Sequence, residues 1–543
     1  MTRTVRWLAV SFFILFPAAA WADAPALSGF VHIGAQPAEG VVVTARRNDS
    51  AVSVSIVSDA RGRFIFPAGR LLPDAYALTI RLGGYELAQP VTLTLRAGEL
   101  ANADLALTPG HNLSAELTDA DWLTAMSGSD RDRRALATCL SCHSLERVVN
   151  STHSAAEFIP TLRRMLNYAA ETGQNTIPQR RTPVETPDAR LAEFASFLAS
   201  INLSQKQQGW RAGLHPAPPP SGRSQRVFIT QYHLPRPNIE PHDVVIGRDG
   251  AIWYSDDNEP VLGRLDPLTG DVEEFPYPLL KPDQPPGGLD LEADGEGNLW
   301  LALMAQGGLA RFDVTSKRFT LFPVSPGLNH DTTQQSMVMP AGAAVDGKVW
   351  TTDVGTRSIL RLDIASGVYE RAPVFGPADK GSHLPYGLMA DAQNNLWFLD
   401  FGAEAIARVD AKTLVTSVYP TPTHFSHPRR GRLADGKITF AEFGAQKIGV
   451  FNMASETFQE FSAPAAWSFP YDAAMDRAGQ IWTGNLANDR VTRLNPQSGA
   501  TEEYLLPEHA AVRRIFVDES TSPPSLWLAG NHSAALFHIE PLQ

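Results

Sequence analysis

Asp294-Gly-Glu-Gly-Asn-Leu-Trp300 is the stretch that decides the fold of this 543-residue chain, because its pattern returns throughout the C-terminal part. Each unit continues with a second strand, an Ile-x-Arg-Leu-Asp segment, Thr-Gly and Glu-Phe-x-x-Pro. The register residues follow one another at intervals of 42 to 50 residues: Trp253, Trp300, Trp350, Trp397, Thr439, Trp482 and Trp527. Seven such units, each with room for four strands, predict a seven-bladed β-propeller over residues 225–543.

The strand that opens this region is expected to close the ring. Residues 227–235 resemble the outer strand that ends other units, as in Glu502-Glu-Tyr-Leu-Leu-Pro507, and the last unit lacks an outer strand of its own. We expect the first strand to pair with the last unit, which removes exposed edges. A proline-rich segment, residues 206–224, precedes the propeller and is typical of a semi-rigid linker.

Residues 110–205 show helical periodicity and contain the only two cysteines of the chain, in the motif Cys139-Leu-Ser-Cys142-His143. Both thiols of a C-x-x-C-H motif bond covalently to haem, and the histidine binds the iron. A zinc site usually needs a second ligand pair, and no further cysteine exists. The motif predicts one haem c, and this segment resembles a small, all-α class I cytochrome c domain.

The second iron ligand has two candidates. Met165, on the helix expected from residue 155 to residue 170, gives a thioether ligand and a higher potential, and His153 gives a bis-histidine site of lower potential. This segment resembles bacterial cytochrome domains that have an Arg-Met pair on the helix after the C-x-x-C-H motif. The resemblance implies that the methionine of this pair is the iron ligand, so we favour Met165. An open iron position is the third alternative.

Residues 25–108 alternate apolar and polar side chains in short runs separated by turn residues, which predicts a small β-sandwich. The segments Gly40-Val-Val-Val-Thr44, Ser58-Asp-Ala-Arg-Gly-Arg-Phe64 and Gly83-Gly-Tyr85 resemble the carboxypeptidase regulatory-like domain. That resemblance implies a carbohydrate-binding-like fold without catalytic residues. The whole chain is therefore expected to be multidomain and mainly β, with sandwich, cytochrome and propeller in that order.

Residues 1–22 have the features of a cleaved signal peptide, with Arg3 and Arg6 before an apolar core and Ala20-Trp-Ala22 at the cleavage site. We expect export to the periplasm and no membrane span. The net charge of −12 disfavours nucleic acid as a partner. A dehydrogenase or a small cytochrome of the periplasm is the expected redox partner.

The sequence of the propeller repeats, such as Glu442-Phe-Gly-Ala-Gln-Lys-Ile-Gly449, resembles that of virginiamycin B lyases (streptogramin lyases). That family opens a lactone by elimination, with histidines from neighbouring blades and glutamates that bind magnesium. The resemblance implies a catalytic role for His242 and a cation site, for Mg²⁺ or Ca²⁺, at Glu240 and Asp256. Arg513 stands where the second catalytic histidine is expected, and Pro286-Gly287 where a tyrosine is expected.

Further polar residues recur at equivalent places of the units and are expected to face the central funnel, where propellers bind small ligands. They comprise Tyr386, Arg429, Tyr471, Asp353, Asp400 and Glu442. This mixed set of charges and aromatic rings indicates a small polar ligand. Capping of strands and lining of a wet channel is the structural alternative for the same residues.

Two functions follow from these residues. The first is a periplasmic c-type cytochrome whose propeller binds a ligand or a partner, so that the chain acts in electron transfer or as a subunit of an oxidoreductase. The second is a lyase-like enzyme with an accessory haem domain. We favour the first, because the haem motif is complete and the lyase site is not.

Overall fold

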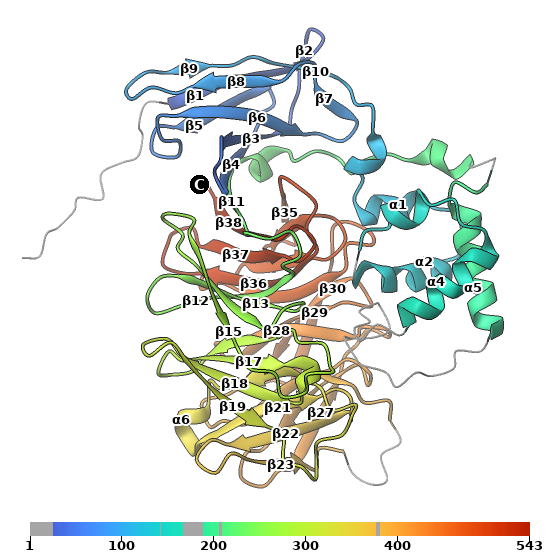
Figure 1. The fold of residues 1–543 in the computed structure, drawn as a ribbon, viewed down its shortest axis with the longest axis vertical. Helices are drawn as coiled ribbons and strands as arrows, with labels where there is room; N and C mark the ends of the chain where they lie inside the picture. Colours follow the sequence, from blue (N-terminus) through green and yellow to red (C-terminus); the bar gives the residue numbers. More distant parts are fainter. Residues whose placement is uncertain (1–24, 142, 167–187, 206–208, 376–380, 543) are drawn as a thin grey trace, which may run out of the picture.

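The computed structural model describes residues 25–141, 143–166, 188–205, 209–375 and 381–542. Figure 1 shows the small sandwich at one edge of the propeller and a group of helices beside the propeller. The predicted signal peptide and Cys142 lie outside the described residues.

Seven four-stranded units form the propeller, and six of them are separate antiparallel sheets. The first three blades comprise β12 (Pro241–Ile246), β13 (Ile252–Asp256), β14 (Val261–Leu265) and β15 (Val272–Pro276); β16 (Leu291–Ala293), β17 (Leu299–Leu303), β18 (Gly308–Asp313) and β19 (Arg318–Pro323); β20 (Gln335–Met339), β21 (Lys348–Asp353), β22 (Ser358–Asp363) and β23 (Val368–Ala372). The next three comprise β24 (Pro385–Ala390), β25 (Leu396–Asp400), β26 (Ala405–Val409) and β27 (Thr416–Pro420); β28 (Pro428–Ala434), β29 (Lys437–Glu442), β30 (Lys447–Asn452) and β31 (Thr457–Ser462); β32 (Pro470–Met475), β33 (Ile481–Asn485), β34 (Arg490–Leu494) and β35 (Thr501–Leu505).

The repeated Asp-x-x-Gly-x-Leu-Trp motif is the turn between the first and second strands of a blade. In the second blade, Asp294 Oδ1 accepts hydrogen bonds from the backbone N–H groups of Glu296 and Asn298, and Asp294 Oδ2 accepts one from Trp300 Nε1 at 3.0 Å. Gly297 has a φ of +92°, which an L side chain rarely adopts. The motif therefore forms the turn and fixes the buried tryptophan at once.

The seventh blade is closed by the first strand of the region, as predicted. β36 (Val512–Asp518), β37 (Ser525–Gly530) and β38 (Ala535–Pro541) are followed in the sheet by β11 (Val227–His233), and β36 contacts β12. β11 also pairs along its other edge with β4 (Val52–Val57) of the sandwich, so the two sheets are continuous. This pairing attaches the sandwich to the propeller and covers the outer edge of the blade.

The N-terminal sandwich has two sheets around one core. One sheet has the order β4, β3 (Val42–Arg47), β6 (Ala75–Arg81) and β8 (Val91–Thr94). The other is built around β1 (Pro25–Ile33) and includes β2 (Gln36–Pro37), β5 (Arg63–Pro67), β7 (Tyr85–Leu87), β9 (Ala101–Asn102) and β10 (Leu105–Pro109). Alternating side chains such as Val43, Ala45, Phe64 and Phe66 fill the space between the sheets, which confirms the predicted strand pattern.

In the part of the chain that the structure describes, five α-helices lie between the sandwich and the linker, and we call this segment the helical unit. They are α1 (Asp119–Ala125), α2 (Asp130–Leu136), α3 (Glu146–Val149), α4 (Ala155–Leu166) and α5 (Asp188–Ile201). Short 3-10 helices, η1 (Leu113–Glu116), η2 (Ala137–Ser141) and η3 (Gly209–Gly213), connect or flank them. The predicted apolar stripe of the last helix faces inward, since Leu191, Leu198 and Ile201 are buried.

The helical unit shares its core with the propeller. In the described residues, its buried side chains, including Trp122, Leu136 and Leu198, belong to one apolar cluster with propeller residues such as Phe401 and Phe443. We expected a separate all-α domain, and the structure instead gives a small helical layer that is completed by the propeller face. Burial of apolar area across this boundary holds the two parts together.

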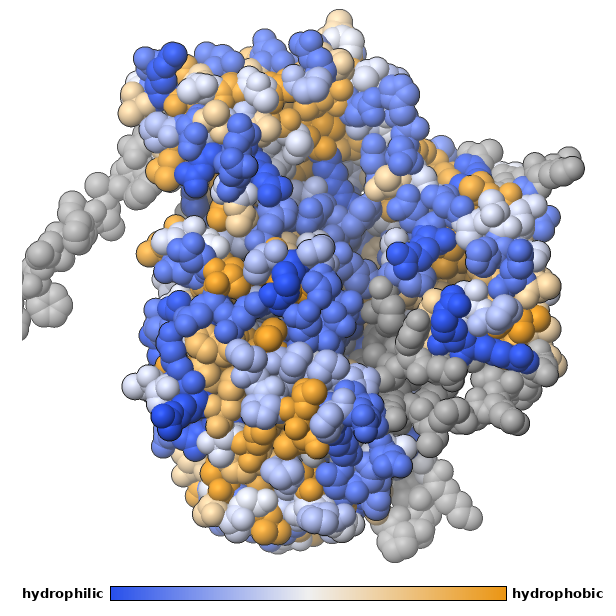
Figure 2. Space-filling view, in the orientation of Figure 1, coloured by the Kyte–Doolittle hydropathy of each residue, from blue (hydrophilic) through white to orange (hydrophobic). Residues whose placement is uncertain are grey.

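The exposed surface is mostly polar in the view of Figure 2, with smaller hydrophobic areas over the sandwich and the blades. Among the described residues, no helix combines the length and the apolar character needed to cross a bilayer.

Candidate functional site

The C-x-x-C-H motif follows a capped helix. Ser129 Oγ accepts a hydrogen bond from the Asp132 backbone N–H, and the Asp132 carboxylate accepts one from the Ser129 backbone N–H, a capping box that begins α2. α2 continues directly into η2, where Cys139 lies half-buried against the shared apolar cluster. Cys142, the second cysteine of the motif, lies outside the described residues.

His143 has one ring nitrogen engaged by the backbone. Nδ1 lies 3.0 Å from the carbonyl oxygen of Ser144, and the His143 backbone N–H donates to the Cys139 carbonyl at 3.3 Å. A carbonyl only accepts, so Nδ1 is the donor, and in the neutral imidazole the lone pair is then on Nε2. An imidazole held in this tautomer by a backbone carbonyl is typical of metal-ligating histidines.

The two candidates for the second iron ligand lie at opposite ends of α4. His153 is exposed in the loop before the helix, with its ring 5.3 Å from that of Phe158, and its carbonyl accepts a hydrogen bond from Asn202. Met165 is half-buried in the last turn. The choice between them stays a prediction, and residues 167–187, which follow Met165, lie outside the described residues.

The helical unit packs against one face of the propeller, through the apolar cluster that both parts share. The fourth residue after each register residue forms a ring around the funnel mouth, and five of the seven are apolar members of the shared cluster: Met304, Val354, Phe401, Phe443 and Leu486. The two polar positions, Asp257 and Asn531, belong to the first and seventh blades, which are neighbours. The ring therefore has one polar gap.

A cavity of about 290 Å³ lies beside this gap. His143 and Glu146 line it from the helical unit, and Glu240, Asn531 and His532 line it from the propeller. Asn531 is 2% exposed, and neither atom of its amide has a hydrogen-bond partner among the described residues. A buried amide of this kind is usually satisfied by water or by a ligand, so the cavity is suited to polar contents.

Inside the funnel, the structure brings together five of the residues predicted from the sequence. His242 Nδ1 lies 2.7 Å from Asp243, and its Nε2 lies 3.3 Å from the Tyr471 hydroxyl. Arg429 donates to the same hydroxyl at 3.1 Å and stacks over the Tyr471 ring at 4.0 Å. The Tyr386 hydroxyl lies 3.3 Å from that of Tyr471, and Arg513 lies 6.0 Å from the Tyr471 ring.

The electrostatics of this group are set by burial and by the arginines. Burial lowers the pKa of His242, which keeps the imidazole neutral against the attraction of Asp243. Burial alone would raise the pKa of Tyr471, but Arg429 and Arg513 lower it below its ordinary value. The phenol of Tyr471 therefore lies beside a neutral imidazole, at hydrogen-bond distance from its Nε2.

A buried ionic network lies deeper in the propeller, and the sequence analysis missed it. Arg430 binds both oxygens of Asp243 at 2.6 and 2.8 Å and also contacts Asp290, and Arg514 binds Asp243 at 2.8 Å. Burial opposes the ionised form of Asp243, yet the two arginines hold its pKa well below the ordinary range. Asp243 in turn orients His242. The sequence signal that could have revealed these residues is the repeated Pro-x-x pattern of the first strands, in which Asp243 and Arg430 hold the last position.

Three of the acids predicted for the funnel or for the cation site cap turns. Asp256, Asp353 and Asp400 each accept hydrogen bonds from backbone N–H groups before the first strand and after the second strand of their own blade. The geometry thus gives these residues the structural role that the sequence left open. Glu442 differs: it is fully buried, it accepts no hydrogen bond within the described chain, and burial and Glu460 raise its pKa to about 8.

Asp257, which the sequence analysis did not single out, faces the cluster instead of Asp256. Its carboxylate lies 4.0 Å from Arg513, and burial raises its pKa to about 6 against the attraction of Arg513 and His242. A Cβ at Gly287 would lie 1.8 Å from the Asp257 carbonyl oxygen. No side chain fits there, which explains why glycine stands where the lyase resemblance implies a tyrosine.

The predicted cation site at Glu240 and Asp256 is not assembled as expected. Asp256 Oδ1 is occupied by the backbone N–H groups of Glu240, Asn258 and Glu259. Within the described ranges, no group of three or more histidine, cysteine or acidic side chains is arranged to hold a metal ion.

Comparisons with known proteins agree with the two β parts. Residues 26–108 match the Carboxypeptidase regulatory-like domain, and residues 222–430 match the Virginiamycin B lyase family. None of the curated proteins searched matches the chain.

Solved structures of lyases are similar to the propeller. A streptogramin B lyase is 22% identical with a TM-score of 0.50, over 59% of this chain and 99% of that chain. Virginiamycin B lyase from Staphylococcus aureus is 19% identical with a TM-score of 0.50, over 58% of this chain and 100% of that chain. A catalytically inactive variant of the latter, with quinupristin, is 18% identical. At these identities the likeness shows the fold alone: this chain carries a carboxypeptidase regulatory-like domain and a propeller of the virginiamycin B lyase kind.

Proposed function

We propose that this protein is an exported c-type cytochrome that transfers electrons, with one haem attached at Cys139 and Cys142 and ligated by His143. The observation that carries the proposal is the engagement of His143 Nδ1 by the Ser144 carbonyl, next to the complete C-x-x-C-H motif. This contact leaves Nε2 for an iron ion. When bound, a haem supplies one-electron redox chemistry.

The described surroundings of the motif fit a haem. Cys139 lies on a short helical turn whose neighbours Leu136, Leu140 and Leu145 are buried and apolar. An apolar, water-poor surrounding is one of the means by which a protein sets the reduction potential of a haem. Met165 on α4 is the proposed second ligand, with His153 as the alternative.

The position of His143 supports a role for the propeller in the same function. His143 lines the cavity of about 290 Å³ whose other wall is formed by Glu240 and Asn531 of the propeller. A polar ligand held in the funnel, or a partner protein bound to the propeller, would thus be close to the proposed redox centre. We propose a dehydrogenase or a small cytochrome of the periplasm as the electron-exchange partner.

Pyridine haemochrome spectra and intact mass of the protein, exported from cells that mature c-type cytochromes, test the proposal. We expect one covalent haem per chain, loss of the covalent adduct in the Cys139→Ala variant, and an altered spectrum in His143→Ala. Ser141→Ala, within the motif but without a proposed role, is the matched control. A parent protein without haem refutes the proposal.

The second ligand is tested by potentiometry. Met165→His replaces a thioether by an imidazole, so the reduction potential should fall. His153→Ala should leave the potential nearly unchanged. The reverse pattern would assign the position to His153.

A lyase-like activity is the second candidate, because His242, to which the resemblance gives a catalytic role, lies within the region that matches the family. The contacts of His242 weaken it: Nδ1 faces Asp243, Nε2 faces Tyr471, and Gly287 leaves no room for the expected tyrosine. Incubation with a cyclic depsipeptide lactone, followed by mass spectrometry, decides the matter. Cleavage by the parent and its loss in His242→Ala would favour the lyase; no cleavage by the parent rejects it.

A further inference from the structure

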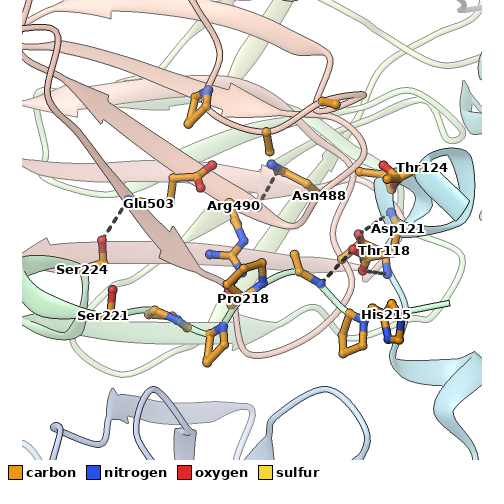
Figure 3. Close-up of a pocket in the computed structure, with 18 of the residues that line it drawn as sticks. Thr118, Asp121, Thr124, His215, Pro218, Ser221, Ser224, Asn488, Arg490 and Glu503 are labelled. Carbon is orange, nitrogen blue, oxygen red and sulfur yellow. Dashed lines mark hydrogen bonds between the residues drawn. The ribbon is translucent and has the colours of Figure 1, made fainter. Parts of the chain in front are cut away.

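A second cavity lies where the linker, the helical unit and the sixth blade meet. Its volume is about 590 Å³, within the range of small-molecule sites. α1 contributes Asp121 and Thr124, the linker contributes residues 215–221, and the propeller contributes Asn488, Arg490 and Glu503. Figure 3 shows these three propeller side chains near one another, with Arg490 directed toward Pro218 of the linker.

The propeller wall carries open hydrogen-bonding capacity. Asn488 is 2% exposed, and its Nδ2 has no hydrogen-bond partner among the described residues, although its Oδ1 accepts from the Arg490 backbone N–H at 3.2 Å. Oε1 of Glu503 is buried and also lacks a partner within the described chain. A donor and an acceptor left open in the same cavity indicate a ligand that offers both.

Opposite charges line the cavity without neutralising one another directly. Arg490 uses one N–H group, Nη2, to donate to the Pro218 carbonyl at 2.6 Å, and a guanidinium has five. Burial lowers the pKa of Arg490 and raises that of Glu503, and the attraction between them only partly offsets this. Both groups therefore gain from a bound counter-charge.

The remaining walls limit the other features of the ligand. The Asp121 carboxylate is already used by the Ala217 backbone N–H at 2.9 Å and by the helix cap at Thr118. Aliphatic surface comes from both sides of the cavity: Pro216, Pro218, Pro219, Pro220, Pro464 and Ala465. A ligand with one negative group, one positive group and an aliphatic body complements this set.

We propose that this cavity binds a zwitterionic α-amino acid, with its carboxylate at Arg490 and Asn488, its ammonium group at Glu503 and its side chain against the prolines. Charge-assisted hydrogen bonds of this kind are about twice as strong as neutral ones. Because the site is built from the linker, α1 and the sixth blade together, a bound amino acid also ties these segments to one another. The proposal is independent of the haem.

Isothermal titration of the full-length exported protein with L-leucine, L-valine and L-proline tests the inference. We expect saturable binding of at least one of them, and none of leucine methyl ester or N-acetyl-leucine, which each lack one charge. Glu503→Gln and Asn488→Asp should weaken binding at least about tenfold. Glu502→Gln is the matched control on the same strand, because Glu502 pairs with Arg223 at 2.8 Å and does not line the cavity.

Three results would overturn the inference: no heat of binding with any of the three amino acids, equal affinity in Glu503→Gln, or equal affinity for the two blocked derivatives. Saturable binding of D-glucose in their place would reject the zwitterion and assign the cavity to polyhydroxylated ligands. Retention of the parent's thermal midpoint in Glu503→Gln separates lost binding from lost folding.

Discussion

Replacement of Asp119 by Asn is expected to change how the stability of the helical unit depends on pH. Asp119 begins α1 at the junction of the three parts of the chain, and its Oδ1 accepts a hydrogen bond from the Leu145 backbone N–H at 2.7 Å. Asp489 and His509 of the propeller lie near it, and Arg81 of the sandwich binds Asp489 at 2.6 Å. The variant keeps an oxygen for Leu145 and loses only the titratable group.

The sign and the size follow from the pKa of Asp119. Burial, reinforced by the negative charges of Asp489 and Glu146, raises this pKa from 3.8 to about 7, against the Leu145 hydrogen bond and His509. Between these values the folded protein holds a proton that the unfolded chain has released, so stability falls as the pH rises. One proton contributes about 1.4 kcal/mol per pH unit, or roughly 4 kcal/mol over the whole shift.

Urea unfolding followed by circular dichroism at 222 nm, between pH 5 and pH 8, measures this effect. The parent should lose stability with rising pH relative to Asp119→Asn, and the difference should level off above the folded pKa. The pKa of His509 is also raised, so its contribution has the same sign, and this histidine is present in both proteins. Asp130→Asn, an exposed acid at the start of α2, is the control. Parallel curves for parent and variant would refute the reasoning.

Three further changes test the propeller by thermal unfolding. Arg430→Met removes the guanidinium that binds Asp243 and Asp290, and a broken buried pair costs about 3–5 kcal/mol of stability. The control Arg408→Met breaks a surface pair with Asp410 and should cost less than about 1 kcal/mol. Equal losses of stability in the two variants would contradict the network. Gly287→Ala places a Cβ 1.8 Å from the Asp257 carbonyl oxygen and should destabilise the protein several times more than Gly295→Ala, whose Cβ meets nothing within 4 Å. Similar thermal midpoints of the two variants would argue against the close approach of Gly287 to Asp257. Tyr471→Phe removes the hydroxyl shared by His242, Arg429 and Tyr386 and should cost about 1–3 kcal/mol, whereas Tyr419→Phe, whose hydroxyl is near the surface, should be close to neutral.

The blades could be predicted because their signal is local. The motif from Asp294 to Trp300 contains its own hydrogen bonds, so spacing along the chain is enough to find the turn and the tryptophan. Ring closure by β11 was also predictable, since that strand resembles the outer strands of the other units. Its second pairing, with β4 of the sandwich, was not, because the free edge of a strand carries no sequence mark for its partner.

The funnel shows how a shift of one residue changes a prediction. The third residue after a register tryptophan, as in Asp256, still belongs to the strand and caps the turn, whereas the fourth, as in Asp257, turns into the funnel mouth. The spacing in the sequence shows that acids recur near the end of the second strand. Which carboxylate faces Arg513 depends on where β13 ends, and it ends at Asp256, so Asp257 is the one that faces Arg513. The ionic partners of Asp243 were hidden for a similar reason, because Arg430 and Arg514 lie far from Asp243 in the sequence.

The polar gap in the funnel ring relates the two halves of the proposed function. The five apolar ring positions belong to the apolar cluster shared with the helical unit, whereas covering Asp257 and Asn531 with apolar side chains would desolvate a carboxylate and an amide. The cavity of about 290 Å³ remains at that place, and His143 lies on its helical side. Because Asp257 contacts Arg513, beside Tyr471 and His242, the proposed iron ligand and the most polar part of the funnel border the same gap. A ligand bound there would meet the propeller charges and the proposed redox centre together, which neither part of the chain provides alone.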